Sequence, residues 1–308
     1  MTAFNDDCTL TLDLLTAWQA QPIAALRKQF RSGVPLVLVA EGSSQLMPGG
    51  FLRSCARAWN WTTSVDALGG RAFAALPSTP RAVIAISNSG RSREVVEAMS
   101  RFPADATALV GIPGGQLTKL PHHVLLPRAE VAVPATASVF GTCLALGHAL
   151  ADVCGQRVPT AELLTAVRQQ LSGPEPVTSV GNVKRVFWLG GHAGATAELA
   201  LKTMEMTGLP GFDMPGSLGL HGIHEVLAPG DLVVALDIHS DDIGELRRRV
   251  EVQCGARLHA PTLPNLGVWT PLVALVHGWR VLATVAIALG RDPVKPARAT
   301  KLGNPALG

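Results

Sequence analysis

Three polar residues in the second half of the chain have types and a spacing that suit acid–base chemistry. Lys202 and Glu205 are three positions apart, so on a helix they share one face, where a carboxylate base and an ammonium can point at one bound molecule. His221 follows sixteen residues after Glu205 in the glycine-rich segment GSLGLHG, which predicts a loop. An imidazole can exchange protons near neutral pH. Taken alone, the Lys202–Glu205 pair is also typical of an exposed helical ion pair, which contributes about 0.3–0.5 kcal/mol.

Two serine-rich turns follow predicted strands in the first half of the chain. Their polar residues are Ser43, Ser44, Ser87, Asn88, Ser89 and Ser92. Hydroxyls and backbone N–H groups at the start of a helix form a donor-rich concavity that suits a phosphate dianion, and Gly90 allows the backbone to approach it closely. An ordinary capped loop is the alternative for either turn, because serine is favoured at helix N-caps. Two such turns after neighbouring strands favour phosphate.

The elements that would position these residues are predicted twice along the chain. Apolar, β-branched runs recur at offsets of 149 or 150 residues, and the pairs begin at Val37 and Val186, Ala82 and Leu232, and Ala106 and Ala256. Helical patterns are predicted at 12–30, 91–101, 136–154, 197–207 and 241–252. This alternation predicts an α/β fold with two tandem doubly wound, flavodoxin-like domains, each a parallel sheet flanked by helices. Ligands gather at the carboxyl ends of such strands.

A linker between the two predicted domains is indicated by residues 171–181, which are rich in Pro, Ser and Gly. The predicted domains are therefore 1–170, with an amino-terminal helix, and 171–308, with a carboxyl-terminal tail. Hydrophobic residues make up 47% and charged residues 16% of the 308 residues, which excludes a disordered chain.

The charge and the apolar segments of the chain limit the classes of partner that we expect it to bind. The net charge is +3, and the short basic run 247–249 is typical of a solvated helix face, so nucleic acid is not expected. Asp6 and Asp7 are atypical of a signal peptide. The apolar window 272–289 contains His277 and Arg280, as a buried helix does, so no membrane partner is expected.

Five cysteines at spacings that match no zinc or redox motif predict reduced thiols. We expect a cytoplasmic protein.

The segment from Glu198 to His221 resembles the catalytic segment of the sugar isomerase (SIS) family, which includes the isomerase half of glucosamine-6-phosphate synthase. In both, E and A-L-K are followed after two residues by a second E, and later by a histidine before glycine. SNSGRS is similar to the family's phosphosugar loop S-Q-S-G-E-T, and EGSS to its G-T-S turn. GRDPVKPARATK is similar to the closing segment, with Pro296 five residues before Lys301. The resemblance covers nearly the whole chain.

The resemblance implies a role for each of these residues. His221 would open the sugar ring, Glu205 would move a proton between C1 and C2, and Lys202 and Lys301 would stabilise charge on the sugar oxygens. The serine turns would hold the phosphate, and Val133 would lie near the substrate. No cofactor is expected. The partner would be a small sugar phosphate, and a homodimer would share its active sites.

Some positions depart from the family pattern, and these departures concern the specificity for the sugar more than the class of reaction. Leu218 and Leu220 stand where relatives with G-E-L-K-H-G carry Glu and Lys, and Ala135 lacks a hydroxyl that the family has. His221, His224 and Glu225 are candidate metal ligands, but they lack the HExxH arrangement, so no metal is expected.

The expected function is phosphosugar isomerase or deaminase activity on a hexosamine or hexose 6-phosphate, through an enediol or enolamine. Met1 and Thr2 lead directly into the isomerase-like region, so ammonia derived from glutamine is not expected. One alternative is a deglycase acting on fructosamine 6-phosphates. Another is a non-catalytic phosphosugar-binding protein, as when SIS domains follow a DNA-binding helix-turn-helix, for which the roughly thirty residues before the first strand are too few.

Overall fold

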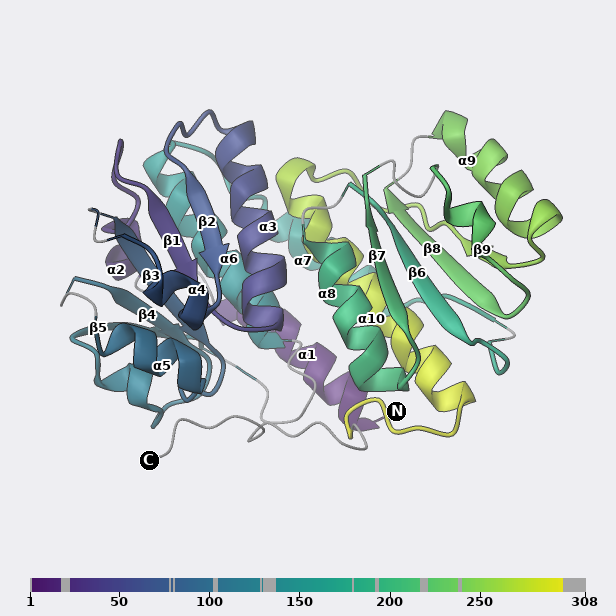
Figure 1. The fold of residues 1–308 in the computed structure, drawn as a ribbon, viewed down its shortest axis with the longest axis horizontal. Coiled ribbons are helices and arrows are strands. Elements are labelled where there is room, and N and C mark those ends of the chain that lie inside the picture. Colours follow the sequence, from purple (N-terminus) through teal and green to yellow (C-terminus); the bar gives the residue numbers. More distant parts are fainter. Residues whose placement is uncertain are drawn as a thin grey trace. The chain divides into compact units, whose positions relative to one another are not determined.

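The protein is described by a computed structural model over residues 2–17, 23–77, 79, 81–101, 105–127, 129, 137–178, 180–191, 194–216, 221–237 and 240–295. These residues form an α/β protein with two parallel sheets flanked by helices (Figure 1). The chain divides into two compact units. We call the one drawn mostly from Asn5–Leu164 the amino-terminal unit and the one drawn mostly from Thr165–Arg298 the carboxyl-terminal unit.

The amino-terminal unit is built on a five-stranded parallel sheet in the order β2-β1-β3-β4-β5. The strands are β1 (Leu36–Val39), β2 (Val65–Leu68), β3 (Ala82–Ser87), β4 (Thr107–Val110) and β5 (His122–Leu125). Every residue of β1, β3 and β4 is buried, which explains their continuous apolar sequences. On one face, Val39 and Ala85 pack with Val95 of a flanking helix.

Within the described residues, the helices of this unit are α2 (Ala24–Arg27), α3 (Ser43–Ala58), α4 (Gly70–Ala74), α5 (Arg93–Met99), the 3₁₀ turn η2 (Gln116–Lys119) and α6 (Ala137–Val153). The division between the units falls within α1 (Thr2–Ala17), after Phe4, and within α7 (Thr160–Ser172), after Leu164. The single helix predicted at 12–30 was wrong, because α1 ends at Ala17 and α2 begins at Ala24. Pro22 lies between them in the sequence, and its missing N–H and fixed ring disfavour a continuous helix.

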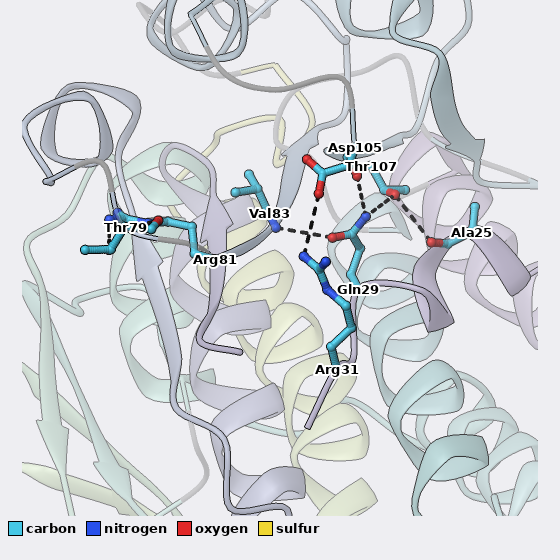
Figure 2. A network of polar contacts seen from close by, with 8 residues as sticks. All are labelled: Ala25, Gln29, Arg31, Thr79, Arg81, Val83, Asp105 and Thr107. Atoms are coloured by element: carbon cyan, nitrogen blue, oxygen red, sulfur yellow. Dashed lines mark hydrogen bonds and ion pairs between the residues drawn. The ribbon is translucent and has the colours of Figure 1, made fainter. Parts of the chain in front are cut away.

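Gln29 joins the amino-terminal ends of two strands (Figure 2). Its side chain is 4% exposed. Its amide nitrogen donates to the Asp105 carbonyl oxygen at 2.6 Å and to Thr107 Oγ1 at 3.0 Å, and its oxygen accepts from the Val83 N–H at 3.3 Å. Satisfying both ends of a buried amide avoids a desolvation cost of about 1–3 kcal/mol. A hollow of about 170 Å³ lies beside this network, at the edge of the sheet opposite to the carboxyl ends of its strands.

The carboxyl-terminal unit has a four-stranded parallel sheet in the order β7-β6-β8-β9. Its strands are β6 (Arg185–Gly190), β7 (Gly211–Pro215), β8 (Asp231–Asp237) and β9 (Arg257–His259). The six runs predicted at offsets near 150 all contain strands, namely β1, β3 and β4 in one unit and β6, β8 and β9 in the other. The first four strands of each sheet follow the same spatial order.

Two helices of the carboxyl-terminal unit, α8 (Ala195–Lys202) and α10 (Thr270–Ala288), pack closely on each other. The unit also contains the π-helical turn η3 (Thr203–Thr207), α9 (Ser240–Arg247) and the π-helical turn η6 (Arg248–Gln253), with short 3₁₀ turns η5 (Ile223–Glu225) and η7 (Gly267–Trp269). A Cβ on Gly278 of α10 would collide with the Leu199 side chain of α8, so this glycine permits the close approach of the two helices.

By length and composition, Gly267–Ala288 could cross a membrane, but 78% of its apolar window is buried inside the protein, as in any core helix.

A chain of buried polar groups connects α10 to its neighbours. His277 Nε2 lies 2.7 Å from His259 Nε2 of β9, and His277 Nδ1 lies 2.8 Å from Gln170 Oε1 of α7. Burial, together with nearby His259 and Arg280, lowers the pKa of His277 to about 3. Arg280 donates to the carbonyl oxygens of Gly173 and Pro174, so the start of the segment predicted as a linker is held against α10.

Candidate functional site

Two turns that were predicted to bind phosphate follow adjacent strands of the amino-terminal sheet. β1 and β3 pair in parallel, with Val39 opposite Ala85, so both strands end at the same edge. In a sheet of order 2-1-3-4-5, the chain reverses its winding direction between β1 and β3, which is where ligands bind in flavodoxin-like folds. Ser43 and Ser44 begin α3 after β1, and residues 87–92, which we call the serine turn, connect β3 to α5.

The serine turn is held by hydrogen bonds among its own residues. Ser87 Oγ lies 2.9 Å from Ser92 Oγ and accepts from the Gly90 N–H at 3.1 Å. Ser89 Oγ accepts from the Arg91 N–H at 3.2 Å. Ser87 is 2% exposed, whereas Ser89 and Ser92 are half-buried. The turn therefore presents hydroxyls whose positions are set before any ligand arrives.

Close packing against the loop after β4 requires glycine in the serine turn. Gly90 has φ +65°, and a Cβ there would lie 3.1 Å from Val110 Cγ1 and 3.2 Å from the Gly115 Cα. The Asn88 carbonyl oxygen accepts from the Gly111 and Ile112 N–H groups at 3.1 and 2.7 Å. The Asn88 side-chain oxygen lies where a Cβ on Gly111 would be. Asn88 thus anchors the turn to the loop after β4.

The turn after β1 contributes the start of a longer helix. Gly42, with φ +54°, precedes Ser43, and its carbonyl oxygen accepts from the Gln45 and Leu46 N–H groups at 2.9 and 3.0 Å. The first amides of a helix lack partners within the helix, so this end is suited to an anion. Ser43 and Ser44 are half-buried there.

In the carboxyl-terminal unit, Lys202 and Glu205 lie together as predicted from their spacing. Lys202 Nζ is 2.6 Å from Glu205 Oε2 and 3.7 Å from Glu198 Oε1. The side chains are 2%, 24% and 0% exposed for Lys202, Glu205 and Glu198, respectively. We call these three residues the Lys202 cluster. Its two ends differ in access, because Glu205 reaches solvent and Glu198 does not, so only Glu205 is placed to meet a bound molecule.

Glu198 was not singled out as a site residue from the sequence. Its position four residues before Lys202 is the signal that could have identified it, because residues at i and i+4 share a helix face. The exposed ion pair that the sequence allowed as an alternative for Lys202 and Glu205 is excluded by the burial of Lys202.

The other predicted site residues are placed less fully. His221 is exposed in a turn just before η5. His224 Nε2 lies 3.5 Å from Glu225 Oε1. Within the described ranges, no three His, Cys, Asp or Glu side chains gather as metal ligands. Val133 and Lys301 lie outside the described residues.

No protein-family model matches the chain, and no curated protein matches it in sequence. Solved structures do match along most of their length. Glucosamine-6-phosphate deaminase from Thermotoga maritima is 19% identical with a TM-score of 0.72, over 95% of this chain and 98% of that one. Tagatose-6-phosphate ketose/aldose isomerase from Escherichia coli is 17% identical with a TM-score of 0.72, over 95% of each chain.

A third match is the C-terminal domain of glucosamine-fructose-6-phosphate aminotransferase from Francisella tularensis, 13% identical with a TM-score of 0.72, over 95% of this chain and 96% of that one. At these identities the similarity concerns the fold. The strand order, the two parallel sheets and these matches agree, and the chain has the sugar isomerase (SIS) fold.

Proposed function

We propose that the protein is a phosphosugar isomerase that acts on a hexosamine or hexose 6-phosphate. The observation that carries this proposal is the 2.6 Å contact between the Lys202 ammonium and the partly exposed Glu205 carboxylate in a chain with this fold. Further support comes from the serine turn, whose hydroxyls and amides suit a phosphate. The structural matches include proteins named as a phosphosugar isomerase and a phosphosugar deaminase.

In the proposed reaction, His221 first moves a proton between the ring oxygen and the anomeric hydroxyl, which opens the ring. Glu205 then takes the proton from C2 and returns it to C1. Lys202 and Lys301 stabilise the negative charge that develops on the sugar oxygens of the enediol. If C2 carries an amino group, the product is an imine; water adds at C2 and ammonia leaves, which completes a deamination.

We also propose an organisation for the protein. Each unit would be one of two tandem doubly wound SIS domains, with a boundary near residues 170 and 171, which the shared strand order of the two sheets supports. A cytoplasmic homodimer with shared active sites would be the working form. The phosphate would bind at Ser43, Ser44 and the serine turn, with Val133 near the sugar.

A panel of substrates tests the proposal and separates its alternatives. The purified protein is incubated with glucosamine 6-phosphate, with a hexose 6-phosphate and with a fructosamine 6-phosphate. Ammonia and a ketose phosphate from the first, or aldose–ketose conversion of the second, would support the proposal. Release of a free amino acid from the third alone would show a deglycase. Binding of all three without turnover would show a phosphosugar-binding protein.

Glu205→Gln tests the assignment of the base. Removal of a general base lowers rates by about 10²–10⁴-fold, so kcat should fall by about a thousandfold while KM changes little. Glu251→Gln is the matched control, because Glu251 is also ion-paired on a helix of the same unit, with Arg247 at 2.9 Å. Turnover by Glu205→Gln at the parental rate would remove Glu205 from the mechanism.

A further inference from the structure

Glu205 does not lie on the regular helix that carries Lys202. α8 ends at Lys202, and Glu205 is the middle residue of η3, which has π-helical hydrogen bonding. Such turns are rare and occur often at functional sites. A π-helical turn has more residues per turn than an α-helix, so the direction of a side chain within it depends on the turn being kept. What keeps it therefore also sets where the Glu205 carboxylate points.

Two threonine hydroxyls hold this turn from within. Thr203 Oγ1 donates to the Leu199 carbonyl oxygen at 2.8 Å, and Thr207 Oγ1 donates to the Thr203 carbonyl oxygen at 2.6 Å. Both threonines are fully buried. Bonds from a hydroxyl to the carbonyl four residues earlier compete with the helical amides and bend helices. The two bonds lie on either side of Glu205 and hold the π-helical turn at both of its ends.

Trp188 of β6 fixes the first of these hydroxyls from outside the helix. Its Nε1 donates to Thr203 Oγ1 at 2.8 Å, and its side chain is fully buried. An indole N–H can only donate, so the Thr203 oxygen accepts here and its own hydrogen is directed to Leu199. At the other end of the turn, the Leu209 N–H donates to Thr207 Oγ1 at 3.1 Å. Both hydroxyls are therefore fixed in position and in direction.

We propose that Trp188, Thr203 and Thr207 are positioning residues, which hold the π-helical turn so that the Glu205 carboxylate meets the Lys202 ammonium. Lys202 is buried and cannot follow Glu205 if the turn relaxes, so the 2.6 Å contact depends on the turn. The catalytic consequence of this proposal rests on the proposed function, but its geometric part does not.

The first experiment compares crystal structures of Thr203→Val, Thr203→Ser and Thr284→Val. Valine keeps the shape of threonine and removes the hydroxyl, whereas serine keeps the hydroxyl. Thr284 makes the same kind of bond, to the Arg280 carbonyl oxygen at 3.0 Å, but within the regular helix α10. We expect the Lys202 Nζ to Glu205 Oε2 distance to exceed about 4 Å in Thr203→Val, beyond the limit for an ion pair. It should keep its parental value in the other two variants.

The second experiment measures kinetics of the same variants on whichever phosphosugar the parent protein converts. kcat should fall about tenfold in Thr203→Val with KM unchanged, and Thr203→Ser should restore it. A general loss of packing would instead reduce the amount of active protein in both Thr203 variants. Trp188→Phe removes the N–H and keeps an aromatic ring, so it provides the same test if Thr203→Val does not fold.

The two experiments can fail separately. If the parent protein converts no phosphosugar, the proposed function fails, and the crystallographic distance still decides whether the turn positions Glu205. An unchanged distance in Thr203→Val overturns the inference. A fall in kcat that serine does not restore, or a parallel rise in KM, also overturns it.

Discussion

The serine turn and the Lys202 cluster hold polar groups in opposite ways. The turn uses neutral hydroxyls and amides that bond to one another, and Ser89 and Ser92 are half-buried. The cluster holds three ionisable side chains, of which Lys202 and Glu198 are almost completely buried. A phosphate dianion brings its own charge, so its binding site can be neutral. A group that moves a proton must be ionisable, and its pairing partners must be shielded from water to act strongly. Damage to the turn should therefore appear in KM, and damage to the cluster in stability and kcat.

The largest effect is expected when the cation is removed from the cluster. Lys202→Met leaves the Glu198 and Glu205 carboxylates without their shared ammonium, and breaking a buried ion pair on one side costs about 3–5 kcal/mol. Denaturant unfolding should show a loss of this size. Lys295→Met is the control, because Lys295 is 81% exposed and 3.8 Å from Asp292, so its loss should cost less than about 1 kcal/mol. Equal losses in both variants would show that the cluster is not a buried charge network.

The unit that contains the cluster should also be sensitive to acid. The folded pKa of His277, about 3, lies below the ordinary value of 6.5, so the unfolded chain takes up a proton that the folded chain does not. The folded state is stabilised by keeping His277 neutral. This contribution is complete above about pH 6.5 and is lost progressively as the pH falls towards 3. The parent protein should lose up to about 1.4 kcal/mol of unfolding free energy per pH unit below pH 6 because of His277. In His277→Leu this part of the pH dependence should be absent, so its plot of unfolding free energy against pH should be less steep. Urea unfolding at several pH values measures this, and parallel slopes would contradict it.

Removing one hydroxyl from the serine turn should weaken binding alone. Ser92→Ala should raise KM about tenfold with kcat unchanged, because a hydrogen bond to a charged group contributes about 1.5–3 kcal/mol. Ser100→Ala is a matched control at the other end of α5, where the hydroxyl donates to the Glu97 carbonyl oxygen at 2.8 Å. Steady-state kinetics of both variants measures this, and KM should rise only in Ser92→Ala. A fall in kcat without a change in KM for Ser92→Ala would show that the serine turn acts in turnover rather than in binding.

The smallest effect concerns the backbone of the turn. Gly90→Ala and Gly33→Ala both place a side chain at positive φ, which costs about 1 kcal/mol. A Cβ on Gly33 meets nothing within 4 Å, whereas one on Gly90 meets Val110 and Gly115. Thermal unfolding should show the backbone cost in both variants and an additional loss in Gly90→Ala. Equal losses would mean that the turn is not packed as described.

The sequence patterns predicted the strands better than the geometry of the site. β-Branched runs at a repeated offset located six strands, because continuous burial in a parallel sheet leaves a local signal. The spacing of Lys202 and Glu205 also predicted that their side chains lie together. The π-helical turn could not be predicted, because it depends on Trp188, which precedes Thr203 by fifteen residues and lies on a different element. The end of α1 before α2 does have a local signal, because Pro22 disfavours a continuous helix.

In the proposed reaction, one sugar phosphate contacts both the serine turn and Glu205, and a crystal structure of Glu205→Gln with bound glucosamine 6-phosphate is the most direct measurement. We expect phosphate oxygens within hydrogen-bond distance of the serine turn hydroxyls. We also expect C1 and C2 of the sugar about 3–3.5 Å from the side chain at position 205, of the same chain or of a second copy. Phosphate bound away from the serine turn, or a sugar whose first two carbons lie far from position 205 in every copy, would show that the two regions do not act on one substrate molecule.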